Sequence, residues 1–204
     1  MLNRTRAMLA LGATLLLLPT APLAQDNPDQ PATGHDEAVF IFGGPLTQSY
    51  FGDAFLVWTD NYEANVFAGI GYQRFFYDYQ SFRLGIEAGL GVRMGPGEPT
   101  SAEAWAGLVG RLTEVEVGPV NITPSITGGF SVVTDTIGSE TTRTLASGDS
   151  AALLYYLAPE IAVSHDDHPE WEGFGRIQHR SGGFGTIAHI DGSNAVTLGL
   201  RYKF

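Results

Sequence analysis

Residues 82–94 read FRLGIEAGLGVRM, and the two kinds of side chain in this stretch alternate with a period of two. Every second residue from Phe82 to Met94 is apolar, whereas the positions between them hold only arginine, glutamate and glycine. Successive side chains of a β-strand point to opposite faces of the sheet. The stretch therefore predicts a strand with one face toward an apolar medium and the other toward a confined polar interior.

The same alternation recurs along most of the chain and predicts an all-β protein. It is clear in 120–132 and less regular in 65–73, 102–112 and 153–164. Counting these segments gives eight predicted strands, at 38–44, 64–75, 81–94, 101–114, 118–133, 151–164, 171–181 and 194–204. An even number of strands, joined by alternating longer and shorter connections, predicts an eight-stranded antiparallel transmembrane β-barrel of the outer-membrane type.

The connections and the polar face of the strands add two expectations. We interpret 134–150, rich in Gly, Ser and Thr, as a mobile extracellular loop, and 115–117 as part of a short periplasmic turn. Eight strands leave no room for an aqueous channel, so we expect the charged side chains to form an ion-pair network filling the lumen. These side chains are Arg83, Glu87, Arg93, Glu103, Arg111, Glu160, Arg176 and Arg201.

The beginning of the sequence has the features of a secretory signal peptide. Arg4 and Arg6 precede an apolar run and then small residues up to Ala24. We predict a signal peptide over 1–24, a flexible leader over 25–37 and the barrel over 38–204. No later apolar run is long enough to span a membrane as a helix. The expected location is the bacterial outer membrane.

Composition excludes several classes of function. The sequence has no cysteine, which excludes disulfides, a thiol nucleophile and a cysteine metal site. Its net charge is −11, and residues 1–24 hold two of the 11 basic residues and none of the 22 acidic ones. The mature chain is therefore still more acidic, and nucleic acid is not an expected partner. We expect no cofactor and no bound metal.

The last predicted strand ends on Phe204, in the outward parity of that strand. A terminal phenylalanine on an amphipathic strand resembles the assembly signal of bacterial outer-membrane barrels, which implies the barrel-assembly machinery as a partner. Together with Tyr72, Trp171 and Tyr202, this residue is expected to form part of the periplasmic aromatic girdle.

The outward positions of the other predicted strands are mostly apolar, but the predicted strand 171–181 has polar residues there. Its arginines lie on the lumen parity, which puts His179 and Ser181 on the outward one. Asn194 lies on the outward parity of the following strand, so we expect it beside His179. Polar side chains on a lipid-facing wall are unfavourable and mark functional sites. A serine, a histidine base and an oxygen that orients the imidazole form the arrangement of a serine hydrolase.

Two other interpretations stay open for the polar residues. The outward His, Ser and Asn can instead mark the extracellular rim, where polar groups meet lipid headgroups. This explains Ser181 easily but explains the His and Asn together less well. The tetrapeptide from His165 to His168 has metal-ligating residue types, but it precedes Pro169 in a predicted turn, where solvated polar residues are ordinary.

The chain resembles the lipid A 3-O-deacylase (PagL-like) family of outer-membrane barrels, a family related to acyloxyacyl hydrolases. The resemblance is carried by the His-x-Ser element at 179–181, the glycine-rich loop after it, and the ending from 192–194 through 199–204. Segments 42–44 and 60–65 also look similar, so the likeness spans most of the predicted barrel.

This resemblance implies hydrolysis of the ester-linked 3-hydroxyacyl chain of lipid A, a part of lipopolysaccharide. Ser181 would be the nucleophile and His179 the general base, with Asn194 at the place where the family has a glutamate. Gly182 stands where the family often has an asparagine in the oxyanion hole, and the backbone N–H groups of Gly182 and Gly183 could replace that asparagine if the loop turns inward. Asp191 is a possible substitute carboxylate.

A second hypothesis comes from a different class of function. The two departures from the family pattern also suit a non-catalytic barrel that serves envelope integrity or surface adhesion. A third possibility, an acyltransferase on the same architecture, requires addition of an acyl chain rather than its loss. A channel is the least favoured, because the lumen of eight strands is too narrow.

Overall fold

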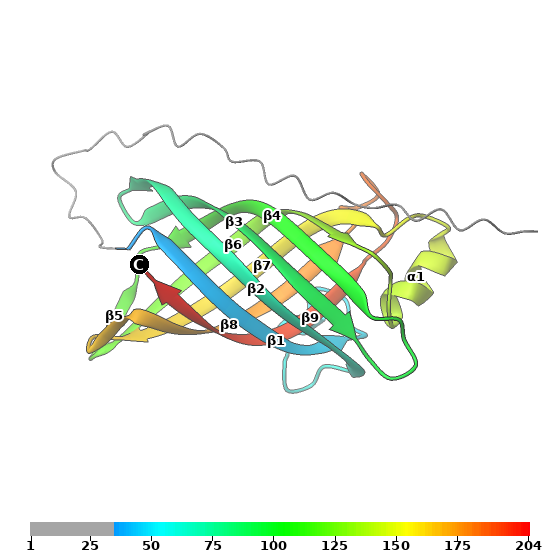
Figure 1. The fold of residues 1–204 in the computed structure, drawn as a ribbon, viewed down its shortest axis with the longest axis horizontal. Coiled ribbons are helices and arrows are strands. Elements are labelled where there is room, and N and C mark those ends of the chain that lie inside the picture. Colours follow the sequence, from blue (N-terminus) through cyan, green and yellow to red (C-terminus); the bar gives the residue numbers. More distant parts are fainter. Residues whose placement is uncertain (1–34) are drawn as a thin grey trace, which may run out of the picture.

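The computed structural model describes residues 35–204, a closed antiparallel barrel (Figure 1), so the predicted signal peptide and most of the predicted leader lie outside the described residues. Within this range there are eight long strands and one short one: β1 Glu37–Thr47, β2 Tyr62–Tyr79, β3 Phe82–Met94, β4 Ser101–Leu112, β5 Val115–Val117, β6 Val120–Val133, β7 Leu153–His165, β8 His168–Ser181 and β9 Ser193–Lys203. Neighbouring strands pair throughout, and the β4–β6 and β1–β9 pairings close the barrel. The predicted fold class is confirmed.

Two connections differ from the sequence-based expectation. The predicted turn at 115–117 is the short strand β5, which pairs only with β6 and extends that hairpin beyond the barrel wall. The predicted mobile loop 134–150 contains the helix α1, Ser139–Ser147, which ends at Gly148 in the left-handed region with φ 75°. A short 3-10 helix, Asp53–Phe55, lies in the first long connection. None of the helices in the described part of the chain is long and apolar enough to cross a membrane.

Helix α1 is anchored to the inside of the barrel by one glutamate. The Glu140 side chain is fully buried and accepts hydrogen bonds from Arg93 at 2.7 Å and from Arg180 at 3.0 Å. Two strands on different sides of the lumen thus hold one helix by a single carboxylate. The glutamate stands in a run of polar residues with no periodicity, so the sequence gives no signal of this contact.

The two ends of the barrel have different connections. The long connections and α1 lie at one end, and the opposite end carries the short turns, β5 and the C-terminus (Figure 1). At that second end the backbone N–H of Phe204 donates to the Glu37 carbonyl at 2.8 Å. The ring of Tyr202 contacts those of Trp171 and Phe204 there, with centroids 4.9 and 6.2 Å away. The end with α1 is therefore the extracellular end.

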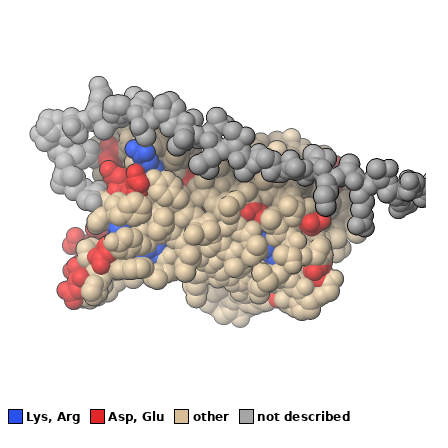
Figure 2. Space-filling model, viewed as in Figure 1, with Lys and Arg blue, Asp and Glu red and all other residues tan. Residues whose placement is uncertain are grey.

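The outer wall of the barrel is apolar. Side chains such as Ile41, Ile70, Leu90 and Leu198 are more than half exposed on it. On the face seen in Figure 2, charged residues gather toward the two ends and few lie between them. An apolar surface this extensive is unfavourable in water but suits the hydrocarbon of a bilayer. The barrel is of the kind that spans the bacterial outer membrane.

The middle of the lumen is filled by aromatic rings that need glycine opposite them. A Cβ at Gly71 would lie 2.2 Å from the ring of Phe40, and one at Gly89 would lie 2.1 Å from the ring of Trp105. The rings of Phe42 and Trp105 meet edge to face with centroids 5.5 Å apart. Glycines on the lumen parity therefore make room for the larger side chains.

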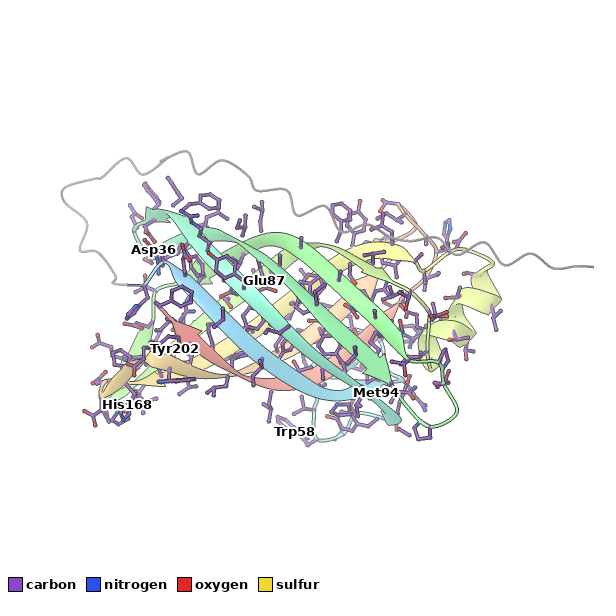
Figure 3. All side chains as sticks on the ribbon, in the orientation of Figure 1. Asp36, Trp58, Glu87, Met94, His168 and Tyr202 are labelled. Carbon is purple, nitrogen blue, oxygen red and sulfur yellow. The ribbon has the colours of Figure 1, made fainter. Side chains whose placement is uncertain are left out.

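The predicted ion-pair network is present around these rings. Glu160 accepts hydrogen bonds from Arg176 at 2.9 Å and from Arg201 at 2.7 Å, and all three side chains are buried. Arg176 also reaches Glu87, the interior residue labelled in Figure 3, at 2.8 Å. Glu172 pairs in turn with Arg111, Arg201 and Lys203. The charges pair with one another inside the barrel, where Glu87, Glu160 and Arg176 are each at most 3% exposed.

Removal of the central negative charge should destabilise the barrel strongly. We expect Glu160→Gln to lower the free energy of unfolding by about 3–5 kcal/mol, because it leaves two buried guanidinium groups without their shared partner. Glu37→Gln is the control, since Glu37 forms an exposed pair with Arg74 at 3.8 Å and should change stability by less than about 1 kcal/mol. Urea titration of the folded band on unheated gels measures both. Equal losses in the two variants would contradict the role of the network.

Candidate active site

A row of three polar side chains crosses the outer wall at the extracellular end. Thr47 of β1 pairs with Asn194 of β9, and Asn194 pairs with His179 of β8, so all three point to the same side of the sheet. Although they face outward, each is at most 6% exposed. They are buried because the connection 48–61 folds back outside the barrel and covers them.

The connection 48–61 exposes apolar side chains on its outer surface, where the polar row would otherwise be exposed. Trp58 is 81% exposed, and Figure 3 shows it on the segment that projects outside the barrel beside β1. Tyr50, Phe55 and Leu56 are also exposed. The polar row is thus separated from lipid by a segment whose outer surface suits lipid contact.

Asn194 orients the imidazole of His179. The Asn194 side-chain N–H donates to the Ser49 carbonyl at 2.8 Å, which identifies its other side-chain atom as the oxygen. That oxygen lies 2.6 Å from Nδ1 of His179. Because an amide oxygen can only accept, Nδ1 must carry the proton, and Nε2 is left as a free acceptor. This is the tautomer that a general base requires.

The connection 48–61 also packs an aromatic ring on one face of the His179 imidazole. The ring of Phe51 lies against that of His179, with centroids 4.3 Å apart and an angle of 32° between the planes. Asn194 fixes the ring at one edge and Phe51 fixes its face. The histidine therefore has a single defined orientation in a mostly apolar environment.

Ser181 lies at the end of β8 and opens into the same cavity as His179. The cavity has a volume of about 490 Å³ and lies between the connections 48–61 and 182–192. Its lining combines the two site residues with aromatic and aliphatic groups, including Phe51, Phe184 and Ile190. No hydrogen bond among residues 35–204 joins the Ser181 hydroxyl to His179. The serine and the base share a cavity without being in hydrogen-bond contact.

The glycine after Ser181 is required by close packing of the loop. A Cβ at Gly182 would lie 1.8 Å from the Ala188 carbonyl oxygen, so no asparagine fits there in this loop conformation. The Gly182 N–H donates to the Ile190 carbonyl at 2.8 Å. The Gly182 N–H is therefore not available to an oxyanion in this loop conformation, because the loop uses it internally. Gly183, the other glycine of the pair, has φ 62° and is not among the residues that line the cavity.

The structure also brings a second histidine and a carboxylate to the cavity mouth. His189 lines the cavity, and its backbone N–H donates to the Asp149 carboxylate at 2.6 Å. This hydrogen bond lowers the pKa of the Asp149 carboxyl below its usual range. The pair was missed from sequence because its members lie on different loops. Asp191 also lines the cavity, but within the described residues its carboxylate makes no hydrogen bond to His179.

The His165–His168 segment forms the short turn between β7 and β8. The backbone N–H of Asp167 donates to the imidazole of His165 at 3.2 Å, which helps to close the turn. Figure 3 labels His168 at the end of the barrel opposite α1, whereas the cavity lies near the end with α1. The described part of the chain has no group of three or more candidate metal ligands.

Fold and site together define the protein as an eight-stranded outer-membrane barrel with an oriented histidine and a serine in a cavity on its outer wall. Its solved structural neighbours include the outer membrane enzyme PagL, with a TM-score of 0.57, 13% identity, and coverage of 82% of this chain and 99% of that one. Neisserial surface protein A (NspA) matches with a TM-score of 0.50 and 12% identity over 83% of this chain and 97% of that chain. At these identities the likeness shows the fold alone. No protein-family model and no curated protein matches the chain.

Removing the ring that covers His179 should expose the imidazole. We expect Phe51→Ala to speed modification of His179 by diethyl pyrocarbonate up to about tenfold, because a stacked aromatic pair contributes about 0.5–1.5 kcal/mol. Trp58→Ala, on the same segment but away from the histidine, should leave the rate unchanged. Peptide mass spectrometry separates His179 from the exposed His189. The same rate in both variants and in the wild type would show that Phe51 does not protect the histidine.

Proposed function

We propose that this chain is an outer-membrane esterase that removes an ester-linked 3-hydroxyacyl chain from lipid A, with Ser181 as nucleophile and His179 as base. The observation that carries the proposal is the 2.6 Å contact between Asn194 and Nδ1 of His179. It leaves Nε2 as the proton acceptor in a cavity that also holds a serine. A histidine oriented in this way has no evident structural purpose on a lipid-facing wall.

The proposed reaction follows the serine-hydrolase sequence. The Ser181 hydroxyl transfers its proton to Nε2 of His179 while its oxygen attacks the ester carbonyl. The tetrahedral intermediate expels the sugar hydroxyl, which takes the proton back from the imidazolium and leaves an acyl-serine. Water then attacks this acyl group through the same histidine, which releases the 3-hydroxy acid. The serine must turn toward the imidazole when substrate binds, and such contacts often tighten only in the complex.

The position of the cavity suits a lipid ester. It lies on the outer wall near the extracellular end, the end of an outer-membrane barrel that is nearer to lipopolysaccharide. Phe51, Phe184 and Ile190 offer an apolar surface to an acyl chain, and the site residues lie among them. The resemblance of the 179–181 element to the lipid A 3-O-deacylase family supports the same substrate.

Under this proposal, Asn194 is expected to make turnover slow. Asn194 keeps the productive tautomer because its N–H is held by Ser49, but it has no charge to stabilise the imidazolium that forms during attack. The internal use of the Gly182 N–H removes one expected oxyanion donor, a loss of about 100- to 1,000-fold in other hydrolases. Turnover slower than that of serine hydrolases with a charged third residue and a complete oxyanion hole is therefore expected.

Mass spectrometry of lipid A from cells that express the protein tests this proposal. Wild type should produce lipid A that lacks one 3-hydroxyacyl chain, and Ser181→Ala should leave lipid A intact because the nucleophile is gone. Ser147→Ala, an exposed serine of α1, is the matched control and should behave as wild type. If lipid A is unmodified with wild type, the activity is refuted. If Ser181→Ala is as active as wild type, the assigned nucleophile is wrong.

A second candidate is a non-catalytic barrel for envelope integrity or surface adhesion. The missing hydrogen bond between Ser181 and His179 and the occupied Gly182 N–H favour it. Under this alternative, deletion of the gene changes detergent sensitivity or surface binding, and Ser181→Ala restores both as well as the wild type does. Rescue by wild type alone would favour the enzyme.

We also propose that the barrel-assembly machinery recognises Phe204. Its ring is half exposed on the outer wall, and its backbone is paired with Glu37, so the ring is available at the edge of a finished strand. Phe204→Ala should lower the amount of folded barrel in the outer membrane, measured as the heat-modifiable band, while detergent refolding of the purified chain is unchanged. Equal membrane levels of variant and wild type would refute this partner.

A further inference from the structure

The side chain of Arg143 joins two loops that flank the His179 site. Arg143 lies on α1, and its guanidinium donates to the backbone carbonyls of Asp191 at 2.7 Å and Gly192 at 2.8 Å. On the other side it donates to the carbonyl of Gln48 at 2.6 Å, with a longer contact to that of Ser49 at 3.4 Å. These residues are far apart in sequence and have no other shared side-chain partner among those described.

The loops that Arg143 joins are the ones that position Asn194. The Ser49 carbonyl, within reach of the guanidinium, accepts the Asn194 side-chain N–H at 2.8 Å. On the other side, Gly192 lies two residues before Asn194 at the start of β9. Arg143 therefore holds both the acceptor that orients Asn194 and the backbone that carries it. The guanidinium also lies 5.2 Å from the ring centre of Tyr50, the neighbour of Phe51.

Helix α1 that carries Arg143 is itself fixed from inside the barrel. Glu140, one turn earlier, is buried against Arg93 and Arg180. Arg180 stands between His179 and Ser181 on β8 and faces the opposite side of the wall. The helix thus contacts the site strand from the lumen through Glu140 and the site loops from the outside through Arg143.

We propose that Arg143 is a positioning residue that holds the Ser49 carbonyl on Asn194, so that Asn194 keeps His179 in the orientation and tautomer of a base. Its effect on turnover rests on the proposed function, whereas its effect on the burial of His179 does not. Arginine is suited to this position because its planar fork donates several hydrogen bonds in fixed directions. A lysine has the same charge but only a single donor centre, and it cannot span two loops.

Two variants and one matched control test the proposal. Arg143→Met removes the donors, Arg143→Lys retains the charge, and Leu145→Ala changes an exposed residue of the same helix. The first readout is modification of His179 by diethyl pyrocarbonate, followed by peptide mass spectrometry. We expect at least about tenfold faster modification in Arg143→Met, because several charge-assisted hydrogen bonds to the covering loop are lost. Arg143→Lys should be intermediate, and Leu145→Ala should match the wild type.

The second readout is hydrolysis of lipid A in mixed micelles. We expect kcat to fall about tenfold or more in Arg143→Met, a larger factor than any rise in KM, because the main effect is that the base is misplaced. Unchanged protection of His179 together with unchanged kcat would overturn the positioning role. A folded barrel in each variant is verified by heat-modifiable gel mobility, and if Arg143→Met does not fold, the comparison of Arg143→Lys with Leu145→Ala decides.

The outcomes separate this inference from the proposed function. If His179 loses protection in Arg143→Met but wild type hydrolyses no lipid A, the esterase proposal fails and Arg143 still positions the histidine. If Ser181→Ala abolishes hydrolysis but Arg143→Met alters neither readout, the esterase proposal stands and the role of Arg143 is refuted.

Discussion

The register of the barrel is the constraint on which the site depends. A shift of one residue in any strand would exchange its lumen and lipid faces, so every charged side chain would move from ion pairs into hydrocarbon. The buried pairs of Glu160 with Arg176 and Arg201 make that shift unfavourable for β7, β8 and β9. Because Arg176 and Arg180 face inward on β8, His179 and Ser181 must face outward. The same interaction that fills the lumen therefore places the candidate nucleophile and base on the outer wall.

An outward polar row is stable only because a loop encloses it. Thr47, Asn194 and His179 would be exposed to lipid if the connection 48–61 pointed away from the barrel. The connection folds back, supplies a backbone carbonyl to Asn194 and a ring to His179, and presents apolar groups outward. One segment thereby accepts the side-chain N–H of Asn194, covers the ring of His179 and restores the apolar surface of the wall.

Period-two patterning was sufficient to predict the barrel, the lumen charges and the outward direction of His179 and Asn194. Each of these follows from alternation within one strand or from pairing of adjacent strands, which sequence records directly. The pattern did not predict α1, Glu140 or Arg143, because their partners lie on strands and loops distant in sequence and belong to no periodic run. The hydrogen bond from the Gly182 N–H to the Ile190 carbonyl could not be predicted either, because it depends on the path of the loop between them.

The neutral residue at position 194 fits a site enclosed on a membrane wall. Asn194 has no exposed surface, and its two side-chain polar atoms both have partners. A carboxylate in its place would be a buried charge that faces the Ser49 carbonyl oxygen, and two oxygens in contact repel each other. An amide avoids this because it donates to Ser49 and accepts from His179 at once. The arrangement favours a stable imidazole in one orientation over stabilisation of an imidazolium, which suits a histidine enclosed within the membrane wall.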